Sequence, residues 1–411
     1  MNVWRQVGLA VIGRVRHGSI EFIEDGKSTV VGDTGADLSC RITIHSPKAW
    51  RQVLRGSTGL AESYAAGYWD CDDLVAMSEI GGRNVDRFDN VKRRFAFIMK
   101  PSQKLFRMRP NNSKRRSRKQ IAAHYDLGND LYEIFLDRSM NYSSAKFTDP
   151  GQPLEEAQIN KMDQICDQLD LGPEDHLLEI GTGWGGLAVH LAQRSGCRIT
   201  TTTISKEQAI LARERVANAG LSESIKVLEV DYRDLTGTYD KLVSIEMIEA
   251  VGWRYFPTYF EKCSNLLKPD GAMLLQAITI IDEAYEIEKT SRNFTNSIIF
   301  PGGCLPSVAE IKRCLSTVTD MKTAWMDEIG ADYAETLKEW RHRFLAAEEQ
   351  VKAFGYDLKF RRIWELYLAW AEGGFRAARI SDFQMLLAKP GFVRGGIAAP
   401  AEARASSSVL S

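Results

Sequence analysis

The stretch from Leu177 to Gly186, Leu-Leu-Glu-Ile-Gly-Thr-Gly-Trp-Gly-Gly, decides the fold. Its first residues are apolar apart from Glu179, which predicts a short buried strand. Glycines follow at 181, 183 and 185, and a helical pattern of apolar residues begins at Leu187. A strand, a glycine turn and a helix N-terminus in this order let the backbone approach a ligand closely. Glu179 stands at the strand end, where a carboxylate can meet a cationic group or a ribose hydroxyl.

The composition is that of a globular protein with two or three domains. The chain has 411 residues, of which 44% are hydrophobic and 26% charged, and its formal net charge is -1. No apolar run reaches the roughly 18 residues that a membrane-spanning helix needs. Seven scattered cysteines at no metal-ligand spacing indicate reduced thiols, and we expect no metal. We also expect no signal peptide, and therefore a cytoplasmic protein.

Residues 1–85 are expected to form a small α+β domain. Short apolar pieces at 19–23, 28–31 and 40–44 predict an antiparallel sheet. Helical patterns follow between residues 47 and 80. Taken alone, this domain indicates no chemistry.

Residues 86–120 differ in charge from the rest of the chain. Between Asn90 and Tyr125 there are twelve Lys or Arg and no Asp or Glu, interleaved with apolar side chains. One interpretation is a helix followed by a solvated basic linker. Another is a basic amphipathic surface that attracts anionic lipid head groups while its apolar side chains dip into the membrane. Nucleic acid is the least favoured partner, because no nucleic-acid-binding motif accompanies the basic run.

From residue 121 to residue 390 the pattern alternates helices and strands. An amphipathic helix is expected over Leu154–Leu169. Besides the strand before the glycines, strands are predicted at 198–203, 225–230, 239–245 and 271–278. This rhythm predicts a doubly wound, mainly parallel, Rossmann-like α/β sheet with ligands at the carboxyl ends of its strands, followed by helical additions. The Tyr-rich segment 122–147 is a candidate lid over the ligand, and residues 391–411 are expected to be a disordered tail.

The glycine turn leaves two kinds of ligand to weigh. Gly181, Gly183 and Gly186 satisfy the G-x-G-x-x-G pattern of dinucleotide sites, which is a weak signal by itself. The second strand, however, ends in Thr200-Thr-Thr-Thr-Ile-Ser205 and offers no acid for an adenosine ribose. A sulfonium cofactor carries no pyrophosphate, so carboxylates and hydroxyls around the pocket suit it better than an anion hole does.

The run from His124 to Ser381 resembles the cyclopropane fatty acid synthases, including the mycolic acid cyclopropane synthases. These are S-adenosylmethionine-dependent enzymes that methylate double bonds in lipid acyl chains. Besides the glycine stretch, the matching motifs are His124-Tyr-Asp-Leu-Gly-Asn-Asp-Leu-Tyr132, Asn141-Tyr-Ser143, Thr203-Ile-Ser-Lys-Glu-Gln208, Asp231-Tyr-Arg-Asp234, Phe300-Pro-Gly-Gly-Cys-Leu-Pro-Ser307, Gly330-Ala-Asp-Tyr333 and Gly374-Phe-Arg376. Residues 1–85 resemble, more loosely, the extra domain of the bacterial phospholipid-acting members.

The resemblance implies which residues surround S-adenosylmethionine. They are Tyr125, Tyr142, Ser143, Glu179, Gly181, Gly183, Thr203, Ile204, Gln208, Asp231, Tyr232 and Arg233. Thr203 and Gln208 would take over the ribose contacts that a carboxylate makes in other methyltransferases. The alternatives are a plain tight turn at the two glycines and a solvent-facing helix residue at Gln208.

Methyl transfer to an alkene leaves a carbocation, so the enzyme needs a base to remove a proton. The family is thought to use a bound bicarbonate, held by a Cys, a Glu, a His and a Tyr. In this chain Glu249 and Tyr333 match two of these residues. Ser144 and Gln276 stand where the Cys and the His would be, and Glu246 replaces a small residue. Bicarbonate therefore stays a candidate, and Glu249 or Glu246 is an alternative direct base.

The expected activity is C-methylation of the cis double bond of unsaturated phospholipid acyl chains at an anionic membrane surface. The run Glu246-Met-Ile-Glu-Ala-Val-Gly252 resembles a branch that makes methylene- or methyl-branched fatty acids, and a separate reductase is then a candidate partner. The main alternative is a cyclopropane synthase. Weaker alternatives are a small-molecule methyltransferase and an inactive lipid-binding protein. We further expect peripheral association with the inner face of the cell membrane, and a homodimer is one candidate assembly.

Overall fold

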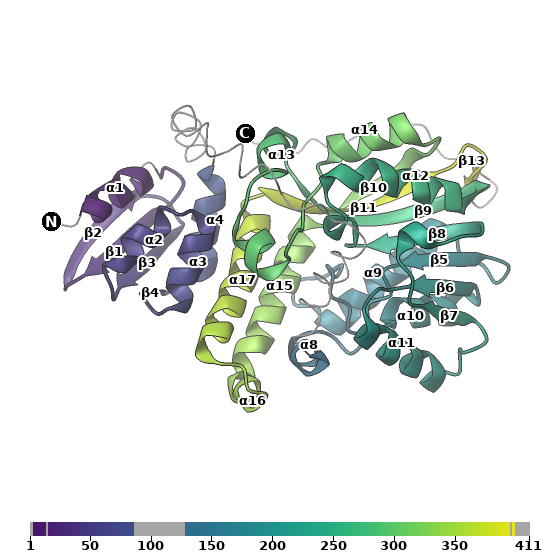
Figure 1. The fold of residues 1–411 in the computed structure, drawn as a ribbon, viewed down its shortest axis with the longest axis horizontal. Helices are drawn as coiled ribbons and strands as arrows, with labels where there is room; N and C mark the ends of the chain where they lie inside the picture. Colours follow the sequence, from purple (N-terminus) through teal and green to yellow (C-terminus); the bar gives the residue numbers. More distant parts are fainter. Residues whose placement is uncertain (1–2, 14, 86–127, 395–396, 399–411) are drawn as a thin grey trace.

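The computed structural model describes residues 3–13, 15–85, 128–394 and 397–398. The N-terminal unit, residues 3–85, lies beside a larger unit that begins at residue 128 (Figure 1). The basic stretch 86–120, Tyr125 and the end of the predicted tail lie outside the described residues. Among the described residues, none of the helices is both long and apolar enough to cross a membrane.

The N-terminal unit is a four-stranded sheet with four helices. The sheet has the order β2-β1-β3-β4. Its elements are α1 (Val3–Ile12), β1 (Ser19–Glu24), β2 (Lys27–Gly32), β3 (Ser39–Ile44), α2 (Lys48–Val53), α3 (Ser57–Ala65), β4 (Trp69–Cys71) and α4 (Leu74–Arg83). The sequence patterns did not reveal α1.

The expectation of an antiparallel sheet over residues 14–45 is confirmed for β1 and β2 and is wrong for β1 and β3, which pair in parallel. The loop after β2 crosses the start of β1. Asp33 N donates to Gly18 O at 2.9 Å, and Ser19 N donates to Leu38 O at 3.0 Å. The chain therefore enters β3 at the same end as β1. Alternating apolar residues predict strands, but they do not say which strands are neighbours.

The larger unit is built on a seven-stranded sheet with the order β10-β11-β9-β8-β5-β6-β7. Of these seven strands, β11 alone runs in the direction opposite to the other six, so the expected mainly parallel α/β sheet is confirmed. The strands are β5 (His176–Ile180), β6 (Arg198–Thr202), β7 (Ile225–Leu228), β8 (Tyr239–Ile245), β9 (Leu267–Ile280), β10 (Lys322–Glu328) and β11 (Ile380–Ala388). The main helices are α8 (Asn129–Phe135), α9 (Leu154–Leu169), α10 (Gly186–Ser195), α11 (Lys206–Asn218), α12 (Phe256–Leu266), α13 (Asp282–Glu288), α14 (Val308–Val318), α15 (Gly330–Ala346), α16 (Glu348–Ala353) and α17 (Leu358–Arg376).

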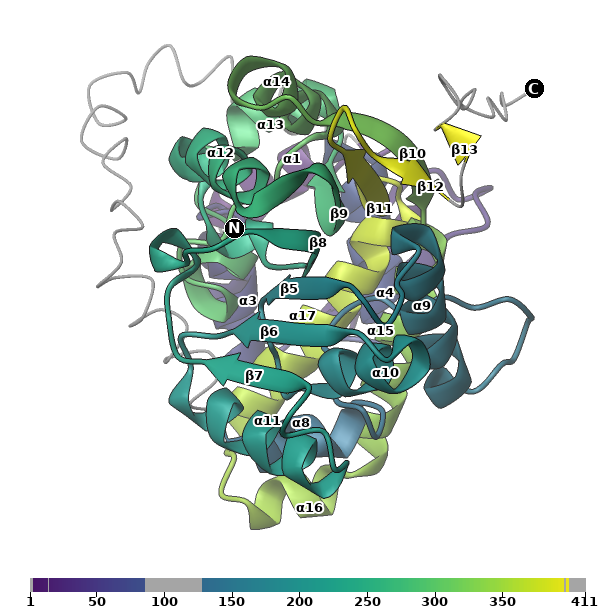
Figure 2. The same ribbon diagram turned by 90° about the vertical axis from the view of Figure 1, so that its right-hand side faces the viewer.

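The strand order reverses at β5. From β5 the chain moves to β6 and β7 on one side, and later to β8 and β9 on the other. Figure 2 shows β8, β5, β6 and β7 one beside another, with α10 and α11 next to the β6–β7 edge. Leu178, Leu242 and Leu274 are fully buried in neighbouring central strands. Ligands of such sheets bind where the order reverses, which is where the glycine turn lies.

Helix α17 joins the two units. The guanidinium of Arg362 donates to Tyr64 O at 2.6 Å and to Trp69 O at 2.8 Å, and it pairs with Asp70. At Gly373 a Cβ atom would stand 2.6 Å from Ser78 Cβ in α4. The two units therefore share one closely packed interface.

Packed structure also continues past residue 390. Phe392 is buried, and Arg394 donates to Gln168 at 2.9 Å. A two-residue strand, β12 (Val393–Arg394), pairs with β13 (Ile397–Ala398). The predicted boundary of the tail at residue 391 therefore lies too early.

Candidate active site

One cavity of about 1450 Å³ opens at the carboxyl ends of β5, β6 and β8. Every predicted cofactor residue in the described part of the chain lines it. The predicted catalytic residues divide into two groups, because Glu246, Glu249 and Tyr333 line the cavity whereas Ser144 and Gln276 do not.

The glycine turn has the backbone that its sequence predicts. Gly181 has φ +105°, Gly183 +50° and Gly185 +85°, all in the region that favours glycine. At Gly186 a Cβ atom would stand 2.2 Å from Ser139 O. The close contact between α10 and the 136–145 segment therefore requires a residue without a side chain at this position. Gly181 N donates to Thr202 O at 3.0 Å and thereby ties the turn to β6.

Glu179 is an acid buried behind this turn. Only 2% of its surface is exposed, and its carboxylate accepts from the Thr201 hydroxyl, which itself lies 2.7 Å from the Thr182 hydroxyl. Burial raises the pKa of Glu179 to about 8. A buried carboxyl with spare acceptor capacity that faces a cavity is suited to a ligand that brings a positive charge or hydroxyl donors.

The ends of β6 and β7 add polar groups. The Thr203 hydroxyl donates to Gln208 Oε1 at 2.9 Å, so this pair faces the cavity together. Asp231 holds the Arg233 guanidinium at 2.7 and 2.8 Å, next to Tyr232. These walls suit an adenosyl group with hydroxyls, and the glycine turn leaves space for its amino acid part.

The Tyr-Ser pair of the 136–145 segment closes the cavity from another side. The Tyr142 hydroxyl lies 2.9 Å from the Tyr367 hydroxyl of α17. The Ser143 hydroxyl accepts from Lys161 Nζ at 2.7 Å. Lys161 is 1% exposed, and burial lowers its pKa to about 8. Lys161 was not among the residues predicted from the sequence, because in α9 it has the pattern of one more polar residue of an amphipathic helix.

Glu246 is the centre of the predicted catalytic group. It has φ +47°, a left-handed conformation that is uncommon for a residue with a side chain. Its Oε1 accepts from Ser144 N and from Gln276 Nε2, each at 2.8 Å. Its Oε2 accepts from the Tyr333 hydroxyl at 2.6 Å. Burial raises the pKa of Glu246, while the hydrogen bonds from Tyr333 and Ser144 oppose that rise.

The Ser144 and Gln276 side chains lie behind Glu246. The Ser144 hydroxyl turns away and donates to Ala145 O, so only its backbone N–H serves the site. Gln276 is fully buried, and its Nε2 donates both to Glu246 and to Asp382 at 2.9 Å. Three of the four positions that the resemblance assigned to a bicarbonate pocket, those of Ser144, Gln276 and Tyr333, therefore converge on the carboxylate of Glu246.

Asp382 is a further buried acid, and it was not among the residues predicted from the sequence. It is fully buried, and its Oδ1 has no hydrogen-bond partner among the described residues. Burial and the neighbouring carboxylates raise its pKa well above the ordinary value. The signal that could have found it is an acid within the apolar strand Ile380–Ala388, but its partner Gln276 is more than a hundred residues away.

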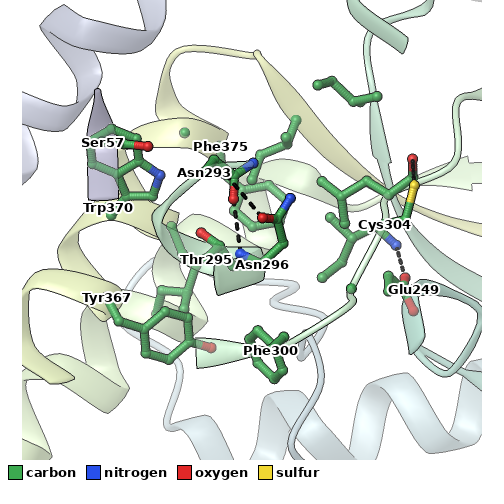
Figure 3. A pocket seen from close by; sticks show the side chains of 18 of the residues that line it. Ser57, Glu249, Asn293, Thr295, Asn296, Phe300, Cys304, Tyr367, Trp370 and Phe375 are labelled. Atoms are coloured by element: carbon green, nitrogen blue, oxygen red, sulfur yellow. Dashed lines mark hydrogen bonds between the residues drawn. The ribbon is translucent and has the colours of Figure 1, made fainter. Parts of the chain in front are cut away.

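Glu249 lies on the other side of this group. Its Oε1 accepts from Ile278 N at 2.6 Å, and its Oε2 is buried without a partner among the described residues. Its backbone O accepts from Cys304 N at 2.8 Å, a contact that Figure 3 shows. Burial and the charge of Glu246 raise the pKa of Glu249 to about 8.

A family profile described as mycolic acid cyclopropane synthetase matches residues 112–385. The chain belongs to this family. It is 39% identical to the tuberculostearic acid methyltransferase of Mycobacterium tuberculosis, over 89% of this chain and 87% of that one. It is 37% identical to the cyclopropane-fatty-acyl-phospholipid synthase of Escherichia coli, over 90% and 92%.

A solved structure of the same family is similar in both sequence and fold. The crystal structure of a mycolic acid cyclopropane synthase in complex with SAH and CTAB is 30% identical, with a TM-score of 0.62, and covers 66% of this chain and 98% of that one. As a member of this family, the protein described here is a methyltransferase that uses S-adenosylmethionine. Its glycine turn, its buried Glu179 and the Thr203–Gln208 pair fit that cofactor.

Proposed function

We propose that this enzyme methylates the cis double bond of an unsaturated phospholipid acyl chain and gives a methylene-branched product. Family membership supports a lipid substrate. The observation that carries the reaction is the position of Glu246, whose carboxylate faces the cavity and accepts hydrogen bonds from three donors. The remaining support for a branched product is the 39% identity to the tuberculostearic acid methyltransferase.

S-adenosylmethionine, when bound, supplies an electrophilic methyl group. The chain's own residues have to hold the alkene in line with that methyl group and to exclude water. Phe300 lines the cavity together with Tyr367 and Phe375 of α17 (Figure 3). Their aromatic faces are suited to an acyl chain. They also stabilise the carbocation that forms on that chain when its double bond takes up the methyl group.

Glu246 is the proposed base. Its carboxylate takes a proton from the added methyl group and becomes a carboxylic acid, while the electrons of the broken C–H bond form a new C–C bond. If a hydride has first moved from the methylated carbon to the neighbouring cationic carbon, those electrons form the C=CH2 double bond of a methylene branch. If no hydride has moved, they close a three-membered ring. The same base therefore serves either product.

The alternative product is the cyclopropane ring. It is favoured by the 37% identity to the Escherichia coli cyclopropane synthase over nearly the same length. A bound bicarbonate is the alternative base for either product, although Glu246 already accepts the hydrogen bonds of the three donors that would hold it.

The test uses the purified enzyme, S-adenosylmethionine and vesicles of a phospholipid with one cis double bond. The methylene and cyclopropane products have the same mass, so the recovered fatty acids are hydrogenated before mass spectrometry. We expect a product that gains two hydrogens. A product that resists hydrogenation and shows ring protons by NMR would replace the branched assignment by the ring. A water-soluble acceptor that is methylated while the lipid is not would refute the lipid substrate.

A further inference from the structure

The cavity does not end at the catalytic carboxylates. It continues between the segment 291–305 and α17, and it reaches the interior of the N-terminal unit. Figure 3 shows this junction, where Ser57 of α3 lies near Trp370 of α17, and Glu249 lies at the opposite side. Phe294 N donates to the Ser57 hydroxyl at 3.0 Å, which joins the segment to the N-terminal unit.

The part of the cavity inside the N-terminal unit, here called the N-terminal arm, is lined by apolar side chains. One face of the sheet supplies alternate residues of β1 and β3, namely Ile20, Phe22, Ile42 and Ile44. The helices add further aliphatic side chains, among them Val11 of α1 and Leu60 of α3.

The polar groups of the N-terminal arm are already engaged. The indole N–H of Trp50 donates to Glu24, and that of Trp69 donates to Ser63. The Ser78 hydroxyl donates to Leu74 O. Arg55 pairs with Glu62. A polar ligand would lose its hydrogen bonds to water in this arm and regain few, whereas an alkyl chain would gain from leaving water.

The cavity is large enough to hold the cofactor and an acyl chain end to end. Its volume of about 1450 Å³ exceeds the roughly 300–1,000 Å³ of a pocket for one small molecule. The cofactor residues occupy only the end at the glycine turn. The remaining length passes Glu246 and Phe375 and ends among the aliphatic residues of the N-terminal unit.

We propose that the N-terminal arm binds the methyl-terminal half of the acyl chain whose double bond is methylated at Glu246. The methyl-terminal half of an acyl chain carries no polar atom, which suits an arm whose named polar groups are already engaged within the described residues. The N-terminal unit is then a substrate-binding part of the site. It selects the number of carbons between the double bond and the chain end. The identity of the chain rests on the proposed function.

Photolabelling tests where the chain end lies. The full-length enzyme is mixed with vesicles of an unsaturated phospholipid that carries a diazirine at the methyl end of its acyl chain, and crosslinked peptides are identified by mass spectrometry. We expect crosslinks within residues 7–82. Crosslinks confined to residues 128–394 would overturn the inference even if the lipid is methylated. Crosslinks in the N-terminal unit without methyl transfer would instead reject the proposed function and keep the binding site.

Narrowing the arm tests chain selection. Leu60→Trp and Val11→Trp place a larger side chain in the arm, and Val30→Trp, at a half-exposed β2 position outside the cavity, is the matched control. Two phospholipids that differ only in the number of carbons beyond the double bond compete for the enzyme. We expect the arm variants to shift the product ratio at least fivefold toward the shorter chain, with unchanged S-adenosylmethionine affinity and unchanged Tm. An unchanged product ratio in folded arm variants would overturn the inference.

Discussion

The Tyr333 hydroxyl donates a 2.6 Å hydrogen bond to Glu246 Oε2, and the Tyr333 ring is stacked on Phe375 with centroids 4.5 Å apart. One residue of α15 thus orients the proposed base and also presents an aromatic ring beside the acyl-chain path. The proposed base and a ring proposed to stabilise the carbocation are therefore in direct contact.

Tyr333→Phe keeps the ring and removes the donor. A buried carboxylate that loses one hydrogen bond is destabilised by about 1–3 kcal/mol, so we expect kcat to fall about 10- to 100-fold. The lost donor also raises the pKa of Glu246 further, and the base must be ionised to act. The pH at which the rate is half-maximal should therefore move upward. A lower rate with an unmoved pH profile would point to a role in packing alone.

Glu246→Gln removes the proposed base while it keeps the shape of the side chain. We expect turnover to fall by at least about 100-fold, the range in which general bases contribute. Calorimetry should show S-adenosylmethionine binding close to that of the unaltered enzyme. The matched variant is Glu249→Gln, whose amide oxygen can still accept from Ile278 N. Its loss should be smaller, because a pKa of about 8 leaves Glu249 mostly protonated at neutral pH. The reverse order of losses would assign the base to Glu249.

The pKa of Glu179 predicts a pH dependence of stability. Burial raises it from 4.5 to about 8 in the folded protein, whereas it is ordinary in the unfolded chain. Between these values the folded state holds the proton and the unfolded state does not, so stability falls as pH rises, by up to about 1.4 kcal/mol per pH unit. Thermal unfolding without cofactor between pH 5 and pH 8 should therefore show a shallower decline for Glu179→Gln. Parallel curves for the two proteins would contradict this prediction.

Two glycines of the turn are expected to differ when changed to alanine. At Gly186 the new Cβ would meet Ser139 O at 2.2 Å, so we expect a clear loss of Tm. At Gly183 no described atom lies within 4 Å of the new Cβ, and the cost is the positive φ, about 1–2 kcal/mol. Gly183→Ala should lose cofactor affinity more than Tm, as measured by calorimetry and thermal unfolding. Equal losses of Tm in both variants would mean that Gly183 is a turn residue only.

Much of the fold could be predicted because its signals are local. The amphipathic pattern predicted α9 with the bounds that the structure has, and the glycine turn predicted the carboxyl end of β5. Thr203 and Gln208 lie five residues apart, so one motif carried both. Periodicity and turn chemistry act over a few residues, which a single sequence displays directly.

The remaining features depend on residues that only tertiary structure brings together. Asp382 lies opposite Ile278 because β11 runs antiparallel beside β9, and no local pattern indicates that pairing. The parallel pairing of β1 and β3 depends on the path of one loop. The sequence by itself determined a methyltransferase-type sheet and its glycine turn. The tertiary structure decided that Glu246 accepts hydrogen bonds from Ser144, Gln276 and Tyr333, and that the cavity extends into the N-terminal unit. Both features depend on residues that are distant in the chain and adjacent in space.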